Sequence, residues 1–154
     1  MKIYVTLGSF KKFDRLLKAV DLIISKKHEF VIQTGETDYV FKNLNNNVYT
    51  QEYFSEIEHL SNIKKADLVI THIGIGTIID LLQYNKKVIF FPRLYRFNEV
   101  ANKHQEDMTK ELRKLGNKVV LRSCDLNIKK AKPIKFFVPE TETFKKELLN
   151  FIKK

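Results

Sequence analysis

Hydrophobic and polar residues alternate along this chain with two different periods, one typical of buried strands and one typical of amphipathic helices. Short, mostly apolar runs predict strands at residues 2–7, 29–34, 67–71, 87–91 and 118–121. The runs at 67–71 and 87–91 are apolar enough to favour burial on both faces of a sheet. Weaker patterns predict extended pieces at Val48-Tyr49 and Tyr53-Phe54.

Between these runs, apolar residues recur three and four positions apart, as they do along one face of a helix. This spacing predicts helices at residues 13–24, 55–66, 78–84, 99–115 and 144–152. Ser55, followed three places later by Glu58, has the pattern of a capping box. The helix that starts there is expected to turn its apolar side chains inward, namely Ile57, Leu60, Ile63 and Ala66. Polar or irregular segments are predicted at residues 36–47, 94–98 and 123–139.

Strands that alternate with helices along the whole chain predict an α/β fold. We expect one Rossmann-like domain over residues 1–154, with a mostly parallel sheet, helices on both faces and right-handed crossovers. Ligands of such sheets bind at the carboxyl ends of the strands, near the switch in strand order.

Composition narrows the class of protein. The 154 residues are 44% hydrophobic, which fits a globular domain and argues against disorder. Cys124 is the only cysteine, so no internal disulfide can form, and a reducing compartment is consistent with this. No apolar run approaches the roughly 20 residues of a membrane span, and the start lacks the pattern of a signal peptide. We therefore expect a cytoplasmic chain.

The net charge of +10 points to an anionic partner, or else to a lysine-rich solvated surface. Nucleic acid, an acidic membrane surface and a phosphorylated ligand all satisfy the first interpretation. No RNA-binding or zinc-finger signature accompanies the charge, so nucleic acid is not expected as a partner.

Three predicted strand-to-helix turns carry the residues with chemical interest. They hold Gly8-Ser9, the run Gly74-Ile75-Gly76-Thr77, and Arg93 followed by Asn102, His104 and Gln105. In a doubly wound sheet, all three turns open on the same edge. The sequence thus predicts one site built from three distant segments.

The turn at Gly74 is the most informative. Glycine lets backbone amides approach an anion, and the following helix adds its free N–H groups and positive dipole end. Thr77 adds a hydroxyl donor, and the carboxylate of Asp80 could accept two hydroxyls of a ribose. The alternative is a tight turn that uses glycine for packing alone. Neither GxGxxG nor GxxxxGK[ST] occurs, which argues against NAD-dependent dehydrogenases and P-loop NTPases.

Several short motifs occur in an order and spacing that define a known pattern. They are Val5-Thr6-Leu7-Gly8-Ser9, Phe13-Asp14-Arg15-Leu16, Ile32-Gln33-Thr34-Gly35, Ala66 to His72, Gly74-Ile75-Gly76-Thr77, Pro92-Arg93 and Asn102-Lys103-His104-Gln105. From Ile3 to Gly116 the chain resembles the glycosyltransferase family that contains the eukaryotic Alg13 subunit, bacterial capsule and exopolysaccharide proteins of the PssE type, and the C-terminal half of MurG.

The resemblance implies the donor-binding half of a GT-B fold, with a UDP-sugar as ligand and no metal or other cofactor. It places Gly8 and Ser9 beside the diphosphate and the backbone of Phe54 at the uracil. The phosphate turn would comprise His72, Gly74, Ile75, Gly76 and Thr77, and Asp80 would contact the ribose. His104 and Gln105 would contact the hydroxyls of the sugar, with Arg93 and Asn102 in the same turn.

Structural roles remain open for some of these side chains. His72 could be bonded to backbone at the end of a strand, and His104 could be buried beside Val100 and Met108. Arg93 could cap a loop or pair with Glu99. The chain also departs from the family pattern at Ile73, which stands where the family usually has a glycine, and isoleucine would be costly there if the backbone needed a positive φ.

In this family the catalytic base and the acceptor site belong to an N-terminal domain. The resemblance therefore implies a two-chain enzyme, whose second chain is an Alg14- or PssD-like, membrane-anchored subunit. The reaction expected is transfer of a sugar to a lipid-linked acceptor in capsule or exopolysaccharide synthesis, close to the inner face of a membrane. The alternatives are a non-catalytic binding or enhancer subunit, suggested by Ile73, and a basic nucleic-acid binder, suggested only by charge.

Overall fold

The computed structural model describes residues 1–8, 12–101 and 103–136. Its strands are β1 (Lys2–Thr6), β2 (Glu29–Gln33), β3 (Val48–Gln51), β4 (Leu68–Thr71), β5 (Lys87–Phe90) and β6 (Lys132–Pro133). Its α-helices are α1 (Asp14–Asp21), α2 (Glu56–Lys65), α3 (Ile75–Gln83) and α4 (His104–Lys114). Three short 3-10 helices follow β5, η1 (Tyr95–Phe97), η2 (Ser123–Asp125) and η3 (Ile128–Lys130). The helix predicted at 144–152 lies outside the described residues.

The strands form a six-stranded sheet in the order β3-β2-β1-β4-β5-β6. The first five strands in that order are parallel, and only β6 pairs antiparallel with β5. The predicted α/β fold with a mostly parallel sheet is therefore confirmed. The strand order changes direction between β1 and β4, which is where ligands of such sheets bind.

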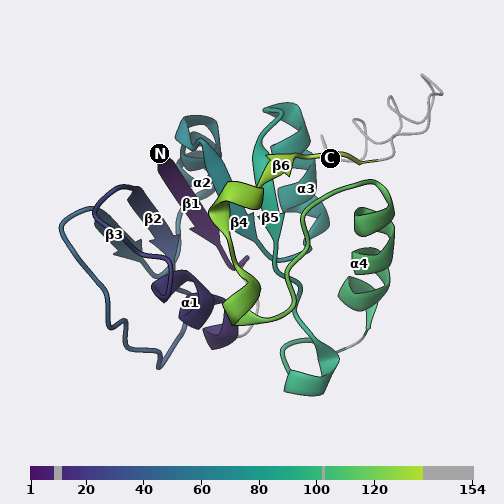
Figure 1. The fold of residues 1–154 in the computed structure, drawn as a ribbon, viewed down its shortest axis with the longest axis horizontal. Helices are drawn as coiled ribbons and strands as arrows, with labels where there is room; N and C mark the ends of the chain where they lie inside the picture. The colour runs from purple at the N-terminus through teal and green to yellow at the C-terminus, as the bar shows by residue number, and fades with distance from the viewer. Residues whose placement is uncertain (9–11, 102, 137–154) are drawn as a thin grey trace.

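Helices and connecting segments cover both faces of the sheet (Figure 1), and an apolar core lies against each face. One packs alternate residues of β1, β4 and β5, such as Val5, against α1 and the segment that carries η2 and η3. The other packs the intervening residues, such as Val69, against α2, α3 and α4. Every residue of β4 is buried, as its apolar run predicts for a strand that is covered on both sides.

Local signals in the sequence explain several element boundaries. The Ser55 side chain accepts a hydrogen bond from the Glu58 amide, and the Glu58 carboxylate accepts one from the Ser55 amide, so the predicted capping box is confirmed. The helix turns Ile63 and Ala66 inward as predicted, but Ile57 is 81% exposed, so that part of the prediction is wrong. α4 ends before Gly116, which has a φ of 85°.

Other boundaries differ from the prediction. α4 begins at His104 rather than at Glu99. The carboxylate of Glu99 instead accepts the amide of Leu94 at 2.8 Å and holds the connection after β5 in a loop. α3 begins at Ile75, three residues before the predicted start. Tyr53-Phe54 is not a strand, and residues 118–121 contribute only one isolated bridge, between Phe90 and Val119.

Within the described part of the chain, no helix is both long and apolar enough to cross a membrane.

Candidate functional site

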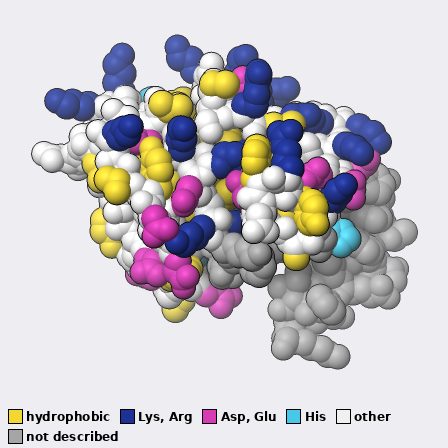
Figure 2. Space-filling model, turned by 90° about the horizontal axis from the view of Figure 1, so that it is seen from below, with side chains coloured by type: hydrophobic (Ala, Val, Ile, Leu, Met, Phe, Trp, Pro, Cys, Tyr) yellow, Lys and Arg dark blue, Asp and Glu magenta, His cyan; other side chains and the backbone are white. Residues whose placement is uncertain are grey.

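The turns that follow β1, β4 and β5 lie together at the carboxyl edge of the parallel strands, as predicted from the strand-helix alternation (Figure 1). Figure 2 views the molecule from this side. Ser9 and Asn102, which the sequence also assigned to the site, lie outside the described residues. The site is therefore described from Gly8, the segment 71–80, and the start of α4.

The imidazole of His72 fills the space between two glycine turns. A Cβ atom placed on Gly8 would lie 2.6 Å from Cε1 of His72, and one placed on Gly74 would lie 2.5 Å from Nε2. Any side chain at either position would displace the ring. Gly8 also has a φ of 72°, a conformation that favours glycine for a second reason. Two glycines from distant segments thus leave the space that one histidine ring occupies.

His72 is held in its neutral form. Burial of the imidazole, with a smaller effect of the nearby Arg93 guanidinium, lowers the pKa of His72 to about 3. Nδ1 lies 3.4 Å from the Thr71 hydroxyl. The Nε2 edge lies beside Gly74 and the start of α3. A neutral imidazole at this place can donate one hydrogen bond without adding charge.

The N-terminus of α3 is available to an anion. Its N-cap is Gly74, which has no side chain that could cap the first amides of the helix. Gly76 follows in the first turn and is exposed, and a Cβ placed on it would meet nothing within 4 Å. Packing therefore does not require glycine at this position. Thr77, the third residue of the same helical turn, is half-buried.

Ile73 packs into the core rather than into the turn. Its side chain is 3% exposed and belongs to the core on the α2 and α3 face. Among the described non-glycine residues, only Asn85 and Asn98 have a positive φ. The backbone at residue 73 therefore does not need glycine. The cost expected for isoleucine at this place does not arise.

Asp80 belongs to a chain of polar side chains that sequence reasoning missed. Nε2 of His59 in α2 lies 3.6 Å from the Asp80 carboxylate, and Nδ1 lies 2.9 Å from the Tyr4 hydroxyl. If the Tyr4 hydroxyl donates to Nδ1, the proton of neutral His59 sits on Nε2 and faces Asp80. Burial raises the pKa of Asp80, and His59 opposes this rise. Tyr4, His59 and Asp80 come from three distant elements, so no local pattern in the sequence indicates this arrangement.

Gln105 joins two of the three turns. Its Oε1 accepts hydrogen bonds from the amide of Arg93 at 2.9 Å and from the amide of Ile73 at 3.3 Å. The start of α4 is thereby tied to the ends of β4 and β5. Because Oε1 accepts these two amides, the Nε2 group is the hydrogen-bond donor that Gln105 can offer to a ligand.

Arg93 does not reach the edge. The side chain is 1% exposed, and its guanidinium donates to the carbonyls of Leu7 at 3.1 Å and Lys12 at 3.0 Å. Burial lowers its pKa to about 10. The geometry supports the structural role left open for Arg93, because its guanidinium holds the carbonyls of Leu7, Lys12 and Glu99. The ligand contact expected of Arg93 stays a prediction.

Phe54 directly precedes the N-cap of α2, and His104 is the first residue of α4. The ring of Phe54 packs edge-on against Tyr4, with centroids 5.8 Å apart, directly before α2. His104 is exposed at the start of α4, so the buried role considered for it is wrong.

Two further groups hold the turns; both lie in motifs that carry the resemblance, but the sequence assigned no role to either. Gln33 accepts a hydrogen bond from the Thr6 hydroxyl at 2.7 Å and donates to the Gly8 carbonyl at 3.1 Å, which braces the first turn. Arg15 donates to the Glu99 carboxylate at 2.8 and 2.9 Å and lies over the Phe91 ring. Its partners lie more than 70 residues away in sequence, so spacing alone could not reveal them.

Within residues 1–8, 12–101 and 103–136, no three His, Cys, Asp or Glu side chains are grouped so that they could hold a metal ion.

The fold and the edge site define a class: the α/β domain found in the C-terminal half of GT-B glycosyltransferases. MurG of Acinetobacter baumannii matches 98% of this chain with a TM-score of 0.57 and 15% identity, and the match covers 41% of that structure. The glycosyltransferase SnogD of Streptomyces nogalater matches 84% of the chain with a TM-score of 0.59 and 21% identity, over 33% of its own length.

The chain belongs to the glycosyltransferase family 28 C-terminal domain family, which matches residues 2–131. It is 29% identical over 114 residues to the UDP-N-acetylglucosamine-N-acetylmuramyl-(pentapeptide) pyrophosphoryl-undecaprenol N-acetylglucosamine transferase of Prochlorococcus marinus, covering 73% of this chain and 30% of that protein. It is 43% identical over 56 residues to the UDP-N-acetylglucosamine transferase subunit ALG13 of Debaryomyces hansenii, covering 36% of this chain and 24% of that subunit. The human ALG13 subunit is 28% identical over 124 residues, which is 75% of this chain and 10% of that protein.

Proposed function

We propose that this chain is the UDP-sugar-binding subunit of a two-component glycosyltransferase that transfers a sugar to a lipid-linked acceptor. The observation that carries the proposal is the uncapped start of α3, where Gly76 leaves open space that packing does not need. Glycine within a helix costs about 1 kcal/mol relative to alanine. A diphosphate bound to the free amides of Ile75, Gly76 and Thr77 would explain glycine at position 76, because it needs the space that a Cβ would fill.

The other edge residues complete a nucleotide-sugar site. The neutral His72 donates to a phosphate oxygen from between Gly8 and Gly74, and Asp80 accepts the ribose hydroxyls. The backbone before α2, at Phe54, holds the uracil. His104 and the Nε2 group of Gln105 contact the sugar hydroxyls. Gly8 is close enough to His72 to lie beside the same diphosphate, and Ser9 and Asn102 are proposed for the same site on the resemblance alone.

In the transfer reaction, the leaving group is UDP, whose β-phosphate gains negative charge as the bond to the sugar breaks. Donors fixed before the reaction stabilise such a charge without reorganising, and the amides of α3 are of this kind. The acceptor hydroxyl has to lose a proton to a base. We propose that this base and the acceptor site lie on a partner subunit of the Alg14 or PssD kind, which also brings the chain to the membrane surface.

The similarity to ALG13, named as a subunit of a UDP-N-acetylglucosamine transferase, supports the two-component arrangement. The similarity to a transferase whose named acceptor is a pyrophosphoryl-undecaprenol supports a lipid-linked acceptor. A role in capsule or exopolysaccharide synthesis is the setting we propose for it. The alternative of a subunit that binds no donor loses its motive, because Ile73 is buried away from the turn.

Calorimetric titration with UDP tests donor binding. We expect UDP to bind, UMP to bind more weakly for want of the second phosphate, and Asp80→Ala to reduce UDP affinity by about tenfold. Asp80→Asn keeps the shape of the side chain and separates loss of charge from loss of packing. If the chain shows no UDP binding either alone or with its partner, the proposal is wrong.

Transfer is tested separately by co-expression with a candidate membrane-anchored partner. Radiolabelled sugar should pass from UDP-sugar to lipid only when both chains are present. Transfer by this chain alone would contradict the division of the site between two subunits.

A further inference from the structure

A second concave surface lies between α4 and the segment 118–130, and none of the residues proposed for donor binding lines it. The groove has a volume of about 570 Å³. Its lining includes five cationic side chains, namely Arg96, Arg113, Lys118, Arg122 and Lys130. A single carboxylate, Asp125, lines it with them. The groove therefore has a strong positive potential.

Little of this charge is neutralised within the described residues. Arg122 donates two hydrogen bonds to the Asp125 carboxylate, of 2.8 and 3.1 Å. In the described part of the chain, no other carboxylate lies within 4.0 Å of the remaining four cations. Arg113 donates to the Val119 carbonyl at 3.4 Å, which holds its guanidinium against the wall of the groove.

An exposed aromatic pair borders the basic groove. Tyr95 and Phe97 in η1 are each 51% exposed, and Arg96 stands between them in sequence. The Arg96 guanidinium lies 4.8 Å from the centre of the Phe97 ring. The Glu106 carboxylate accepts the amide of Tyr95 at 2.9 Å, so η1 is fixed to α4 rather than free.

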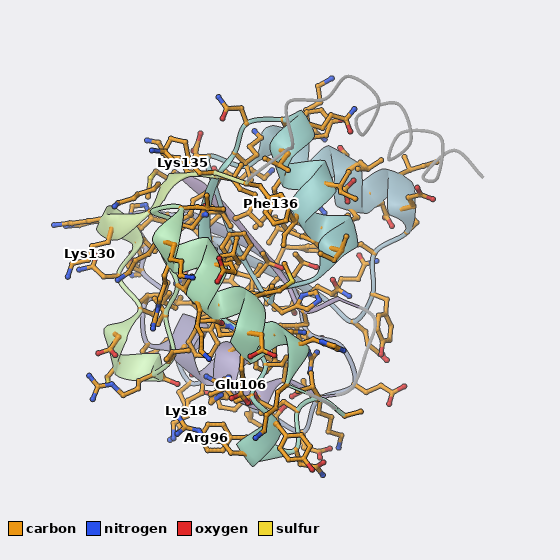
Figure 3. All side chains as sticks on the ribbon, turned by 90° about the vertical axis from the view of Figure 1, so that its right-hand side faces the viewer. Lys18, Arg96, Glu106, Lys130, Lys135 and Phe136 are labelled. Atoms are coloured by element: carbon orange, nitrogen blue, oxygen red, sulfur yellow. The ribbon has the colours of Figure 1, made fainter. Side chains whose placement is uncertain are left out.

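Further lysines extend the positive surface on the same side. Lys18, Lys129, Lys132 and Lys135 are exposed. Figure 3 shows the side chains of Lys130 and Lys135 on one flank of α4, with Lys18 and Arg96 toward the N-terminal end of that helix. Lys and Arg side chains predominate along the upper edge of the view in Figure 2, while acidic side chains gather at a lower corner.

We propose that the groove and η1 form a docking surface that binds directly to the headgroups of an anionic phospholipid bilayer. A bilayer offers many phosphates spread over a wide area, which suits cations spread over several elements. It also offers an interfacial layer in which the rings of Tyr95 and Phe97 are stabilised beside Arg96. A small soluble anion would meet the cations of the groove but leave both rings in water. The proposal does not depend on UDP binding.

Vesicle co-sedimentation of the chain without any partner tests the proposal. The chain should bind vesicles of phosphatidylcholine mixed with phosphatidylglycerol, and not vesicles of phosphatidylcholine alone. Binding should weaken as salt is added, because the attraction is mainly ionic. The triple variant Arg96→Gln/Lys118→Gln/Lys130→Gln should weaken binding by about a hundredfold, since each cation near an anionic surface contributes about fivefold.

A charge-matched control uses exposed lysines from other faces, Lys26→Gln/Lys64→Gln/Lys65→Gln, and should bind nearly as well as the natural chain. Tyr95→Ala should lower the part of the binding that survives high salt. UDP affinity should be unchanged in both triple variants, which separates this test from that of the donor site.

Four results would overturn the proposal. The first is no binding to phosphatidylglycerol vesicles, and the second is equal loss in the two triple variants, which would indicate net charge alone. The third is tight binding of inorganic polyphosphate without vesicle binding, which would assign the groove to a soluble anion. Binding only of an acidic partner protein would likewise contradict it.

Discussion

Gly74 and Gly76 are two positions apart, but packing requires glycine only at Gly74. A Cβ on Gly74 would collide with His72, whereas a Cβ on Gly76 would enter open space. Gly74→Ala should therefore lower the free energy of unfolding by about 1–3 kcal/mol through overpacking. Gly76→Ala should leave stability equal or slightly higher, because alanine is the better helix former. Chemical denaturation of the two variants measures this difference.

The same pair separates packing from ligand binding. Gly76→Ala should weaken UDP binding by about tenfold although the fold is intact, because the added methyl group occupies the approach to the amides of α3. Undiminished UDP affinity in a well-folded Gly76→Ala protein would remove the main support for a diphosphate at this turn.

The neutral His72 makes stability depend on pH. Its pKa is lowered from 6.5 to about 3 on folding, so the unfolded chain binds the proton more readily. The contribution of a neutral buried histidine is fully present above pH 6.5 and is lost as pH falls toward 3. Between about pH 7.5 and 5.5 the free energy of unfolding should drop by about 1.4 kcal/mol from this group.

His72→Gln provides the comparison for that titration. The variant is expected to be less stable at every pH, so the informative quantity is the slope with pH and not the absolute value. The slope should become shallower, leaving the part that arises from His59, whose pKa burial also lowers. An unchanged slope in the variant would show that His72 is not the titrating group.

At the scale of elements, Gln105 ties the start of α4 to the ends of β4 and β5. Gln105→Met removes the acceptor of two backbone amides and should destabilise the protein by about 1–3 kcal/mol. Gln105→Glu keeps an acceptor but loses the Nε2 donor. It should retain UDP affinity while losing affinity for UDP-sugar relative to UDP. Parallel titrations with both ligands measure this ratio, and an unchanged ratio in Gln105→Glu would exclude contact between Nε2 and the sugar.

His59 of α2 and Asp80 of α3 interact electrostatically. His59 counteracts the rise that burial and Glu56 cause in the pKa of Asp80. His59→Leu should therefore raise the pKa of Asp80, so that UDP affinity falls at a higher pH than in the natural chain. Titrations with UDP between about pH 5 and 8 would show this displacement. Tyr4→Phe, which removes the hydroxyl beside Nδ1, should have a smaller effect, and identical pH profiles for all three proteins would contradict a positioning role for His59.

Elements with strong local signals were predicted from the sequence, and those set by distant contacts were not. The capping box at Ser55 and the buried run of β4 depend on neighbouring residues, so their patterns were sufficient. The start of α4 was placed five residues early, because the apolar spacing continues through Val100 while Glu99 bonds to Leu94 and Arg15. The bonds of Arg93 to the carbonyls of Leu7 and Lys12 were not predicted, because these partners come from distant loops.

The candidate site shows the same division. The convergence of three turns follows from topology, and the resemblance supplied the residues expected there. The reason for the glycines was not accessible from the sequence, because the ring that both Gly8 and Gly74 accommodate belongs to a third position. The Tyr4, His59 and Asp80 chain joins three elements whose packing only the structure defines.

For the molecule as a whole, Arg15 connects segments on which both proposed surfaces depend. Its guanidinium donates to the Glu99 carboxylate and to the carbonyls of Pro92 and Leu121. Arg15→Met would leave the buried Glu99 carboxylate uncompensated and should lower the free energy of unfolding by about 3–5 kcal/mol. Glu99→Gln alone should cost less, because the amide oxygen can still accept from the Leu94 amide.

The double variant Arg15→Met/Glu99→Gln measures the coupling between these two side chains. If each single variant acts mainly by leaving a charge unpaired, the double variant should lose less free energy of unfolding than the two single variants together. The expected difference is about 1–3 kcal/mol. Denaturant unfolding should be followed by far-UV circular dichroism, because the chain has no tryptophan for fluorescence. Strict additivity would mean that Arg15 stabilises the loops through its carbonyl contacts and its stacking on Phe91, and that the ion pair contributes nothing of its own.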